Sequence, residues 1–276
     1  APVAPTKFPP KEHPQRIWSQ NMITIKKPEE IAILREGGKR HAEILRRLVE
    51  MAKPSIATRE LNDLAERLIK EGGDEAAFLG YTPKDAKRPY PASLCVSVND
   101  EVVHGIPNEQ EKILKEGDIV SLDLGLRHEG LITDAAVTVP VGKIDEAAEK
   151  LIGATKKALA IGILAAQAGR HVGDIGEAIE KFVAPFGYGI VRDLAGHGVG
   201  YAVHEPPFVP NFGKKGKGKK LLPGMVLAIE PMLNEGTEKV ILDSDSYTYR
   251  TADGKRSAHF EHTVVITASG AEILTS

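Results

Sequence analysis

The amino-acid sequence predicts an α+β protein made of two related halves. Two observations lead to this prediction. Along the 276 residues, two segments with the apolar spacing of helices are followed by runs with strand composition, and this order of elements then occurs a second time. Short sequence matches also recur in the same order in both parts, which indicates an internal duplication. We therefore expect one duplicated domain rather than two independent domains.

Two helices are expected at the start of each half. Residues 28–30, a proline followed by two glutamates, are typical of a first helical turn, and Pro54 ends the helix that begins there. Thr58 is expected to cap a second helix that runs to the glycine pair at 72–73. The two helices of the second half are expected over residues 145–168 and 173–185.

Strand-like runs follow each pair of helices. They are expected at residues 93–98, 119–124 and 132–139 in the first half and at 225–229 and 262–266 in the second. Gly117–Asp123 aligns with Gly224–Glu230, and the pair His104-Gly105 aligns with His197-Gly198. The two halves therefore extend over about residues 28–140 and 145–268, and residues at matching places are expected near a pseudo-two-fold axis.

The composition is that of a globular protein. Hydrophobic residues make up 42% of the chain and charged residues 27%, which argues against wholesale disorder, and the net charge of −2 argues against nucleic acid as the main ligand. The single cysteine, Cys95, cannot build a disulfide framework or a cysteine-based zinc site. The longest apolar run, residues 158–166, is too short for a membrane span of about 20 residues. We expect a cytoplasmic protein without a membrane partner.

Residues 1–20 stand apart from the predicted domain, which spans residues 21–276. This segment is rich in proline and poor in apolar residues, so we expect a flexible, extended arm, partly in the polyproline II conformation. An arm that docks on a partner or lies over the domain is the alternative.

Acidic residues lie in the two most apolar strand-like runs. Asp123 lies within one run, and Glu230 closes the run at the matching place of the second half. A buried carboxylate is costly unless it is paired or binds a metal ion, so a metal site is expected, and a surface acid or a buried ion pair with Lys or Arg is the alternative. Asp134 and Glu261 occupy comparable places on neighbouring strands, and two divalent ions would neutralise the four charges. His104 and His197, each followed by glycine, are expected in tight turns beside them.

The sequence around these residues resembles that of type I methionine aminopeptidases. The resemblance covers about residues 22–270. Besides Asp123 and Asp134, it rests on the segments Asn99–Pro107, Gly196–Gly200, His204-Glu205, Ile229–Pro231 and Glu261–Thr263. It implies the pita-bread (creatinase/aminopeptidase) fold, in which two pseudo-symmetric halves of antiparallel sheet, covered by helices, surround a dinuclear metal site. The duplication in the sequence agrees with that fold.

By this resemblance, five residues would hold two divalent metal ions per chain. Asp123 would serve one ion, and His197 and Glu230 the other. Asp134 and Glu261 would bridge the two ions. The ligand types leave Co, Mn, Fe and Zn open. The pair of ions would activate a hydroxide for attack on the first peptide carbonyl of the substrate.

The resemblance also implies catalytic residues. Glu230 would shuttle a proton from the attacking water to the leaving amine. His204 would hydrogen-bond the carbonyl oxygen, and His104 would contact the scissile amide. A role of His204 as an ordinary turn residue is the alternative.

The resemblance is less exact in the pocket for the methionine side chain of the substrate. Tyr81, Tyr90 and Cys95 fit its positions, although Cys95 can equally be a small core residue. Val203 stands where an aromatic residue often precedes the second histidine, and Tyr247 stands near a usual tryptophan. These departures leave the strictness of the methionine preference open.

The implied function is removal of the initiator methionine from nascent proteins with a small second residue, by a monomeric enzyme. The lysine-rich loop Lys214–Lys220 is either a solvated loop or a contact with ribosomal RNA near the peptide exit. One alternative is a proline-specific peptidase of the same fold, but these enzymes usually carry a large N-terminal domain, and only about 25 residues precede the first helix here. Another is a non-catalytic binding protein of this fold, which would typically have lost metal ligands.

Overall fold

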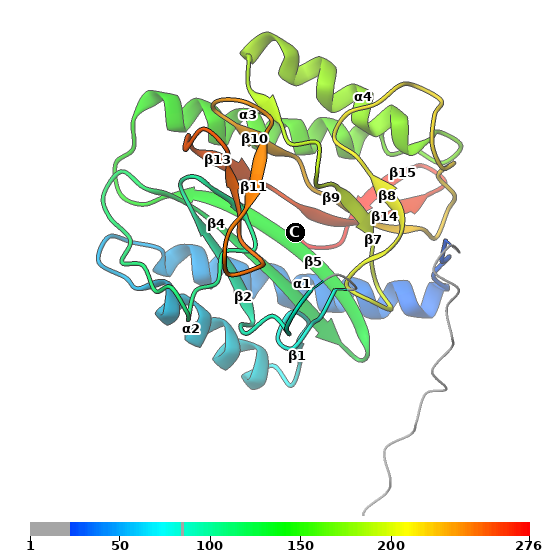
Figure 1. The fold of residues 1–276 in the computed structure, drawn as a ribbon. Coiled ribbons are helices and arrows are strands. Elements are labelled where there is room, and N and C mark those ends of the chain that lie inside the picture. Colours follow the sequence, from blue (N-terminus) through cyan, green and yellow to red (C-terminus); the bar gives the residue numbers. More distant parts are fainter. Residues whose placement is uncertain (1–22, 84–85) are drawn as a thin grey trace, which may run out of the picture.

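Two antiparallel sheets, each covered by a pair of helices, form the body of the molecule (Figure 1). The computed structural model of the chain describes residues 23–83 and 86–276. The proline-rich segment 1–20 lies outside the described residues, so the arm stays a prediction. No helix within the described ranges is long and apolar enough to cross a membrane.

The first half contains two helices and a four-stranded sheet. Strand β4 pairs with β1, β2 and β5, in every case antiparallel. Helix α1 lies against β4 and β5, and α2 lies against β2 (Figure 1). The elements are α1 (Pro28–Met51), α2 (Thr58–Glu71), β1 (Glu75–Ala76), β2 (Leu94–Val98), β4 (Ile119–His128) and β5 (Leu131–Pro140).

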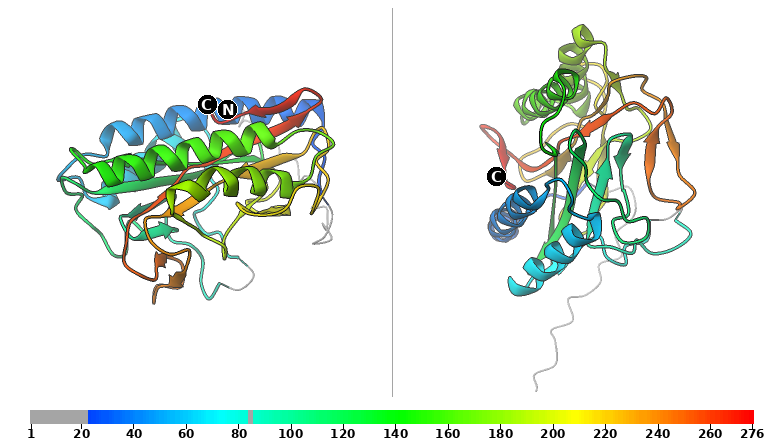
Figure 2. Two further views of the ribbon diagram at one scale, coloured as in Figure 1. Left: turned by 90° about the horizontal axis from the view of Figure 1, so that it is seen from above. Right: turned by 90° about the vertical axis from the view of Figure 1, so that its left-hand side faces the viewer.

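The second half repeats the order of two helices followed by antiparallel strands. Its five-stranded sheet has the order β15-β14-β9-β7-β8, and α3 packs on α4 along one side of it (Figure 2). The elements are α3 (Glu146–Ala165), α4 (Val172–Val183), the short 3-10 helix Ala184–Phe186, β7 (Gly196–Gly198), β8 (Glu205–Val209), β9 (Val226–Ile229), β14 (His262–Thr267) and β15 (Gly270–Ile273).

Two small antiparallel sheets complete the fold. One has the order β11-β12-β3 and the other the order β13-β10-β6. Their strands are β3 (Glu101–Val103), β6 (Gly189–Ile190), β10 (Met232–Asn234), β11 (Val240–Leu242), β12 (Tyr249–Thr251) and β13 (Ser257–His259). Strands β3 and β13 come from different halves, and each leads into a segment with predicted site residues. The two small sheets therefore lie beside the predicted site.

The helices form where the apolar spacing predicts them, because each buries one face against a sheet. In α1 the buried residues include Leu34, Ile44 and Leu48, which lie on one side of the helix. Burial of each such side chain contributes roughly 1.5–3 kcal/mol. Thr58 is not the cap of α2, as the sequence suggested, but its first residue. Ala57 is the cap, and its N–H donates to the Glu60 carboxylate at 2.9 Å.

Strand β4 is longer than the predicted strand at 119–124. The sequence prediction stopped at Gly125, but in the structure Gly125 pairs with Asp134 in the middle of the β4–β5 ladder. A Cβ atom at Gly125 would lie 2.6 Å from the ring of Phe78, so the glycine makes room for this side chain. Tertiary packing therefore explains a glycine that, by local preference alone, ends a strand.

The two halves join through a short set of hydrogen bonds between β5 and the start of β14. The N–H of Asp134 donates to Thr263 Oγ1 at 2.8 Å, and this hydroxyl donates to the Asp134 carbonyl at 2.7 Å. Beside them, the N–H of Glu261 donates to the carbonyl of Ala136 at 2.9 Å. This junction fixes Asp134 and Glu261, one from each half, next to each other.

Candidate metal centre

Four carboxylates and one histidine meet where the two large sheets come together. Asp123 lies in β4 and Asp134 in β5, on adjacent antiparallel strands. Glu230 directly follows β9, Glu261 directly precedes β14, and His197 lies at the centre of β7. All five residues are buried, so the fold brings together the complete set of predicted metal ligands.

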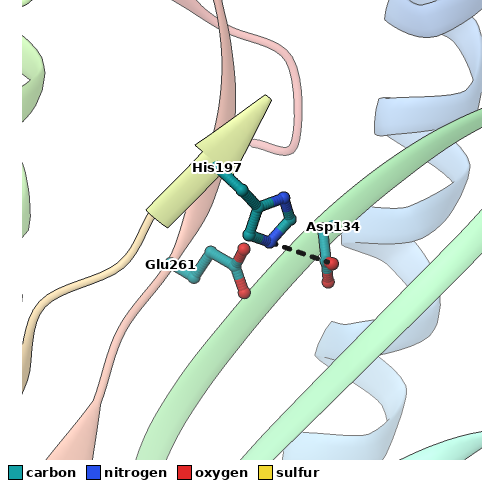
Figure 3. A group of neighbouring side chains, drawn as sticks. All are labelled: Asp134, His197 and Glu261. Atoms are coloured by element: carbon teal, nitrogen blue, oxygen red, sulfur yellow. Dashed lines mark ion pairs between the residues drawn. The ribbon is translucent and has the colours of Figure 1, made fainter. Parts of the chain in front are cut away.

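Three of these side chains make a compact group that could hold a metal ion. One ligand atom each from Asp134, His197 and Glu261 lies within 4.8 Å of the others, and Figure 3 shows the three side chains pointing toward one another. His197 Nε2 lies 4.0 Å from Asp134 Oδ2, along the dashed line in Figure 3, and 3.4 Å from Glu230 Oε1. Imidazole and carboxylate donors of this kind suit Zn, Mn, Fe or Co.

Unpartnered oxygen atoms test whether a metal fits this site. Asp123 Oδ1, Asp134 Oδ1 and Glu261 Oε1 are buried and have no hydrogen-bond partner among the described residues. Buried polar atoms are otherwise almost always hydrogen-bonded, because a lone one loses its hydration without compensation. Three orphaned carboxylate oxygens in one place therefore fit divalent cations.

In the protein without metal, the raised pKa values of the carboxyl groups also indicate that the site lacks positive charge. Burial raises the pKa of Asp123 to about 7. Burial raises the pKa of Asp134, Glu230 and Glu261 well above the ordinary range, and the neighbouring carboxylates raise it further at Asp134 and Glu261. These acids favour the protonated form until cations replace the protons.

Two glycines allow the strand that carries His197 to pack closely against its neighbours. A Cβ atom at Gly196 would lie 2.3 Å from the carbonyl oxygen of Ala228, and one at Gly198 would lie 2.3 Å from that of Pro206. His197 therefore lies in a strand that only glycine neighbours allow to pack this closely, and the prediction that it sits in a tight turn is wrong. His104 does lie outside a strand, in a left-handed conformation with φ of 60°.

His204 lies beside the metal ligands and has a defined partner. Its ring stacks edge-on against that of His197, with 4.4 Å between centroids, and its Nδ1 lies 2.7 Å from Tyr81 Oη. Burial lowers the pKa of both His204 and His104 to about 4, so both imidazoles are neutral near pH 7. Neutral imidazoles can donate a hydrogen bond without adding a charge to the site.

A largely apolar cavity adjoins the carboxylates. The predicted pocket residues Tyr81, Tyr90, Cys95, Val203 and Tyr247 all line it, together with the histidines 104, 197 and 204. Tyr90 and Tyr247 pack edge to face, with ring centroids 5.1 Å apart. A narrow aromatic wall beside a charged cluster suits a substrate with an apolar end and a polar end.

Sequence reasoning missed four residues that line this cavity: Phe78, Pro83, Val103 and His259. A signal for His259 exists, since it precedes Glu261 by two residues and strand side chains alternate, which favours the same side. No local pattern marks Phe78, whose place depends on the space beside Gly125.

The fold and the site define a metallopeptidase. The model of metallopeptidase family M24 matches residues 32–268, and the chain belongs to this family. Within the family, its similarities are to methionine aminopeptidases. It is 46% identical over 254 residues to the methionine aminopeptidase of Clostridium acetobutylicum, covering 92% of this chain and 99% of the relative.

Comparison with solved structures shows the same similarity to methionine aminopeptidases. The crystal structure of methionine aminopeptidase from Thermotoga maritima matches with a TM-score of 0.88 and 43% identity, over 92% of this chain and all of the other. The prolidase of Pyrococcus horikoshii matches with a TM-score of 0.74 and 23% identity over 65% of its chain, a similarity of fold alone. The expected α+β pita-bread fold and the resemblance to type I methionine aminopeptidases are confirmed.

Proposed function

We propose that this chain is a metal-dependent aminopeptidase that removes the initiator methionine from the N-terminus of nascent proteins. The observation that carries the proposal is the meeting of Asp123, Asp134, His197, Glu230 and Glu261 beside an apolar cavity. The sequence similarity to methionine aminopeptidases over nearly the whole chain supports it.

The cavity and the histidines bind and orient the substrate in this proposal. The methionine side chain lies against Tyr90, Tyr247, Cys95 and Val203, which line the cavity. His204 donates from Nε2 to the carbonyl oxygen of the first peptide bond, since its Nδ1 faces Tyr81 Oη. His104, which also lines the cavity, contacts the scissile amide.

The five acidic and imidazole ligands would hold two divalent ions, which would supply Lewis-acid polarisation and lower the pKa of water. Asp123 would help to hold one ion and His197 and Glu230 the other, and Asp134 and Glu261 would contribute to both. A carboxylate oxygen of Glu230 accepts the proton of the attacking water and passes it to the leaving amine. Because the site is buried, bulk water does not reach the oxygen and nitrogen atoms between which this proton moves.

A proline-specific peptidase of the same fold is the alternative function. Its support is a similarity of fold to proteins such as the prolidase of Pyrococcus horikoshii at 23% identity. The complete ligand set argues against a binding protein without catalysis.

Hydrolysis of Met-Ala-Ser by metal-stripped protein tests the proposal. We expect release of free methionine only after addition of Mn²⁺ or Co²⁺, and a fall of roughly 10²- to 10⁴-fold in kcat for Glu230→Ala, because the proton acceptor is lost. Amino-acid analysis of the products provides the measurement. An Xaa-Pro peptide is the comparison substrate, and cleavage of that peptide alone would transfer the function to the proline-specific class.

The loop Lys214–Lys220 is proposed to contact ribosomal RNA near the peptide exit. The N–H groups of Gly173 and Val172 at the start of α4 bond the carbonyls of Lys217 and Lys219, so the loop backbone is anchored while its lysines are exposed. Reversal of the charges at 214, 215, 217, 219 and 220 should abolish low-salt co-sedimentation with ribosomes and leave tripeptide hydrolysis unchanged. We further propose that the protein acts as a monomer in the cytoplasm.

A further inference from the structure

His259 is a buried histidine in the candidate metal centre to which no role has been given above. Its side chain is 1% exposed, and it lines the cavity together with Asp123, Glu230 and Glu261. Neither ring nitrogen has a hydrogen-bond partner among the described residues. A buried imidazole without partners loses its hydration uncompensated, so its presence calls for an explanation in the working site.

The backbone of His259 is held firmly. His259 lies opposite Met232 in the β10–β13 ladder, and Met232 follows Glu230 by two residues. The His259 N–H donates to Thr138 Oγ1 at 2.8 Å, and that hydroxyl lies 2.8 Å from the His259 carbonyl. Thr138 belongs to β5, the strand that carries Asp134, so both halves of the molecule hold the backbone of His259.

The ring points at one of the predicted metal ligands. His259 Nε2 lies 3.5 Å from Glu230 Oε2, while His197 Nε2 lies 3.4 Å from the other oxygen, Oε1. Glu230 is therefore flanked by two imidazoles, one at each oxygen. Two ligands that bind one ion at about 2.0–2.2 Å lie roughly this far apart, so Oε1 and His197 suit a shared ion.

That arrangement leaves Glu230 Oε2 to His259. A carboxylate that binds metal through one oxygen is usually held through the other by a hydrogen-bond donor, which sets its orientation. We propose that His259 is a positioning residue for Glu230, donating Nε2–H to Oε2 and so directing Oε1 to the metal and to the reacting water. This inference rests on the proposed function, because it assigns His259 a task in the same site.

Metal binding to His259→Leu and His259→Gln provides the test. Leucine removes the donor, whereas glutamine keeps an N–H group at the end of its side chain. Calorimetric titration of the metal-stripped proteins with Mn²⁺ should show about 10- to 100-fold weaker binding for His259→Leu, the usual effect of losing such a partner, and near wild-type binding for His259→Gln. In Met-Ala-Ser hydrolysis, kcat should fall and KM should change little for His259→Leu.

Thermal unfolding of the metal-free proteins separates this role from a structural one. His259→Leu should not lower the midpoint, because it replaces an unpartnered buried imidazole by an apolar group. His128→Leu is the matched control: it removes the bond between His128 Nδ1 and Asp74 at 2.7 Å, away from the cavity, and should lower the midpoint without weakening Mn²⁺ binding.

Two outcomes would overturn the inference. Unchanged Mn²⁺ binding in His259→Leu would remove any role for the side chain. Equal losses in both variants, with a changed visible absorption spectrum of the Co²⁺ form, would make His259 a metal ligand instead. Metal affinity is measured apart from turnover. A wild-type protein that binds Mn²⁺ but cleaves no peptide would therefore count against the proposed function, while Mn²⁺ binding by the His259 variants would still test the role of His259.

Discussion

Replacement of Asp134 by asparagine is expected to stabilise the metal-free protein and to abolish both metal-dependent stabilisation and hydrolysis. Asparagine has the shape of aspartate without its charge. In the metal-free protein, burial and the neighbouring Asp123 raise the pKa of Asp134 because they disfavour its charged form. The substitution removes that cost, but it also removes a ligand that the metal ions need.

The pH dependence follows from the same pKa shifts. Asp123 has a pKa of about 7 in the folded, metal-free protein, against about 4 when unfolded. The folded state therefore binds more protons at this site, and the contribution of Asp123 to stability is fully present below about pH 4 and is lost as the pH rises through about 7. Metal ions require the ionised carboxylates, so Mn²⁺ should stabilise the protein more at high pH.

Thermal unfolding at pH 5 and pH 8, with chelator or with Mn²⁺, measures both effects. The wild-type midpoint should fall from pH 5 to pH 8 in chelator, and Mn²⁺ at 100 times its dissociation constant should add about 2.7 kcal/mol. Asp134→Asn should reduce the fall and remove the gain. Asp63→Asn, on the exposed side of α2, is the control and should change neither. A lower metal-free midpoint for Asp134→Asn would refute the electrostatic account.

Replacement of Lys26 by methionine is expected to destabilise the protein by about 3–5 kcal/mol, because it leaves a buried carboxylate without its counter-charge. Lys26 Nζ lies 2.7 Å from Glu205 Oε2, with side-chain exposures of 0% and 6%. Glu205 Oε1 accepts the N–H groups of Tyr201 and Ala202, in the segment that carries His204. A fall in kcat should therefore accompany the loss of stability.

Urea unfolding of the single and double variants measures this coupling. Lys26→Met combined with Glu205→Gln should recover most of the lost free energy of unfolding, since the uncompensated charge is gone and the amide oxygen still accepts the two N–H groups. Arg35→Met is the control: it breaks an exposed pair with Glu272 and should cost no more than about 1 kcal/mol. Equal losses in the single and double variants would show that the charge pair is not responsible.

Asp123 and Glu230 could be singled out from the sequence as candidate metal ligands because their signals are local, and the family resemblance supplied the full candidate set. An acid inside a run of apolar residues, as at Asp123, is costly by itself, and its counterpart Glu230 marks the same place in the second half. The helix α1 and the β4–β5 hairpin follow from apolar spacing and strand alternation, with errors of one or a few residues at their ends. The duplication of the two halves stays a prediction, and the repeated order of elements in the structure is consistent with it.

The roles of residues without a local pattern depended on the tertiary structure. The sequence does not reveal that Lys26 meets Glu205 across 179 residues, or that His259 faces Glu230 from another sheet. Local patterns show which side chains avoid water. Which of them touch is decided by how the sheets of the two halves meet, through contacts such as Thr263 with Asp134. The sequence by itself therefore determined the elements and singled out the candidate ligands, and the tertiary structure decided which residues surround and orient them.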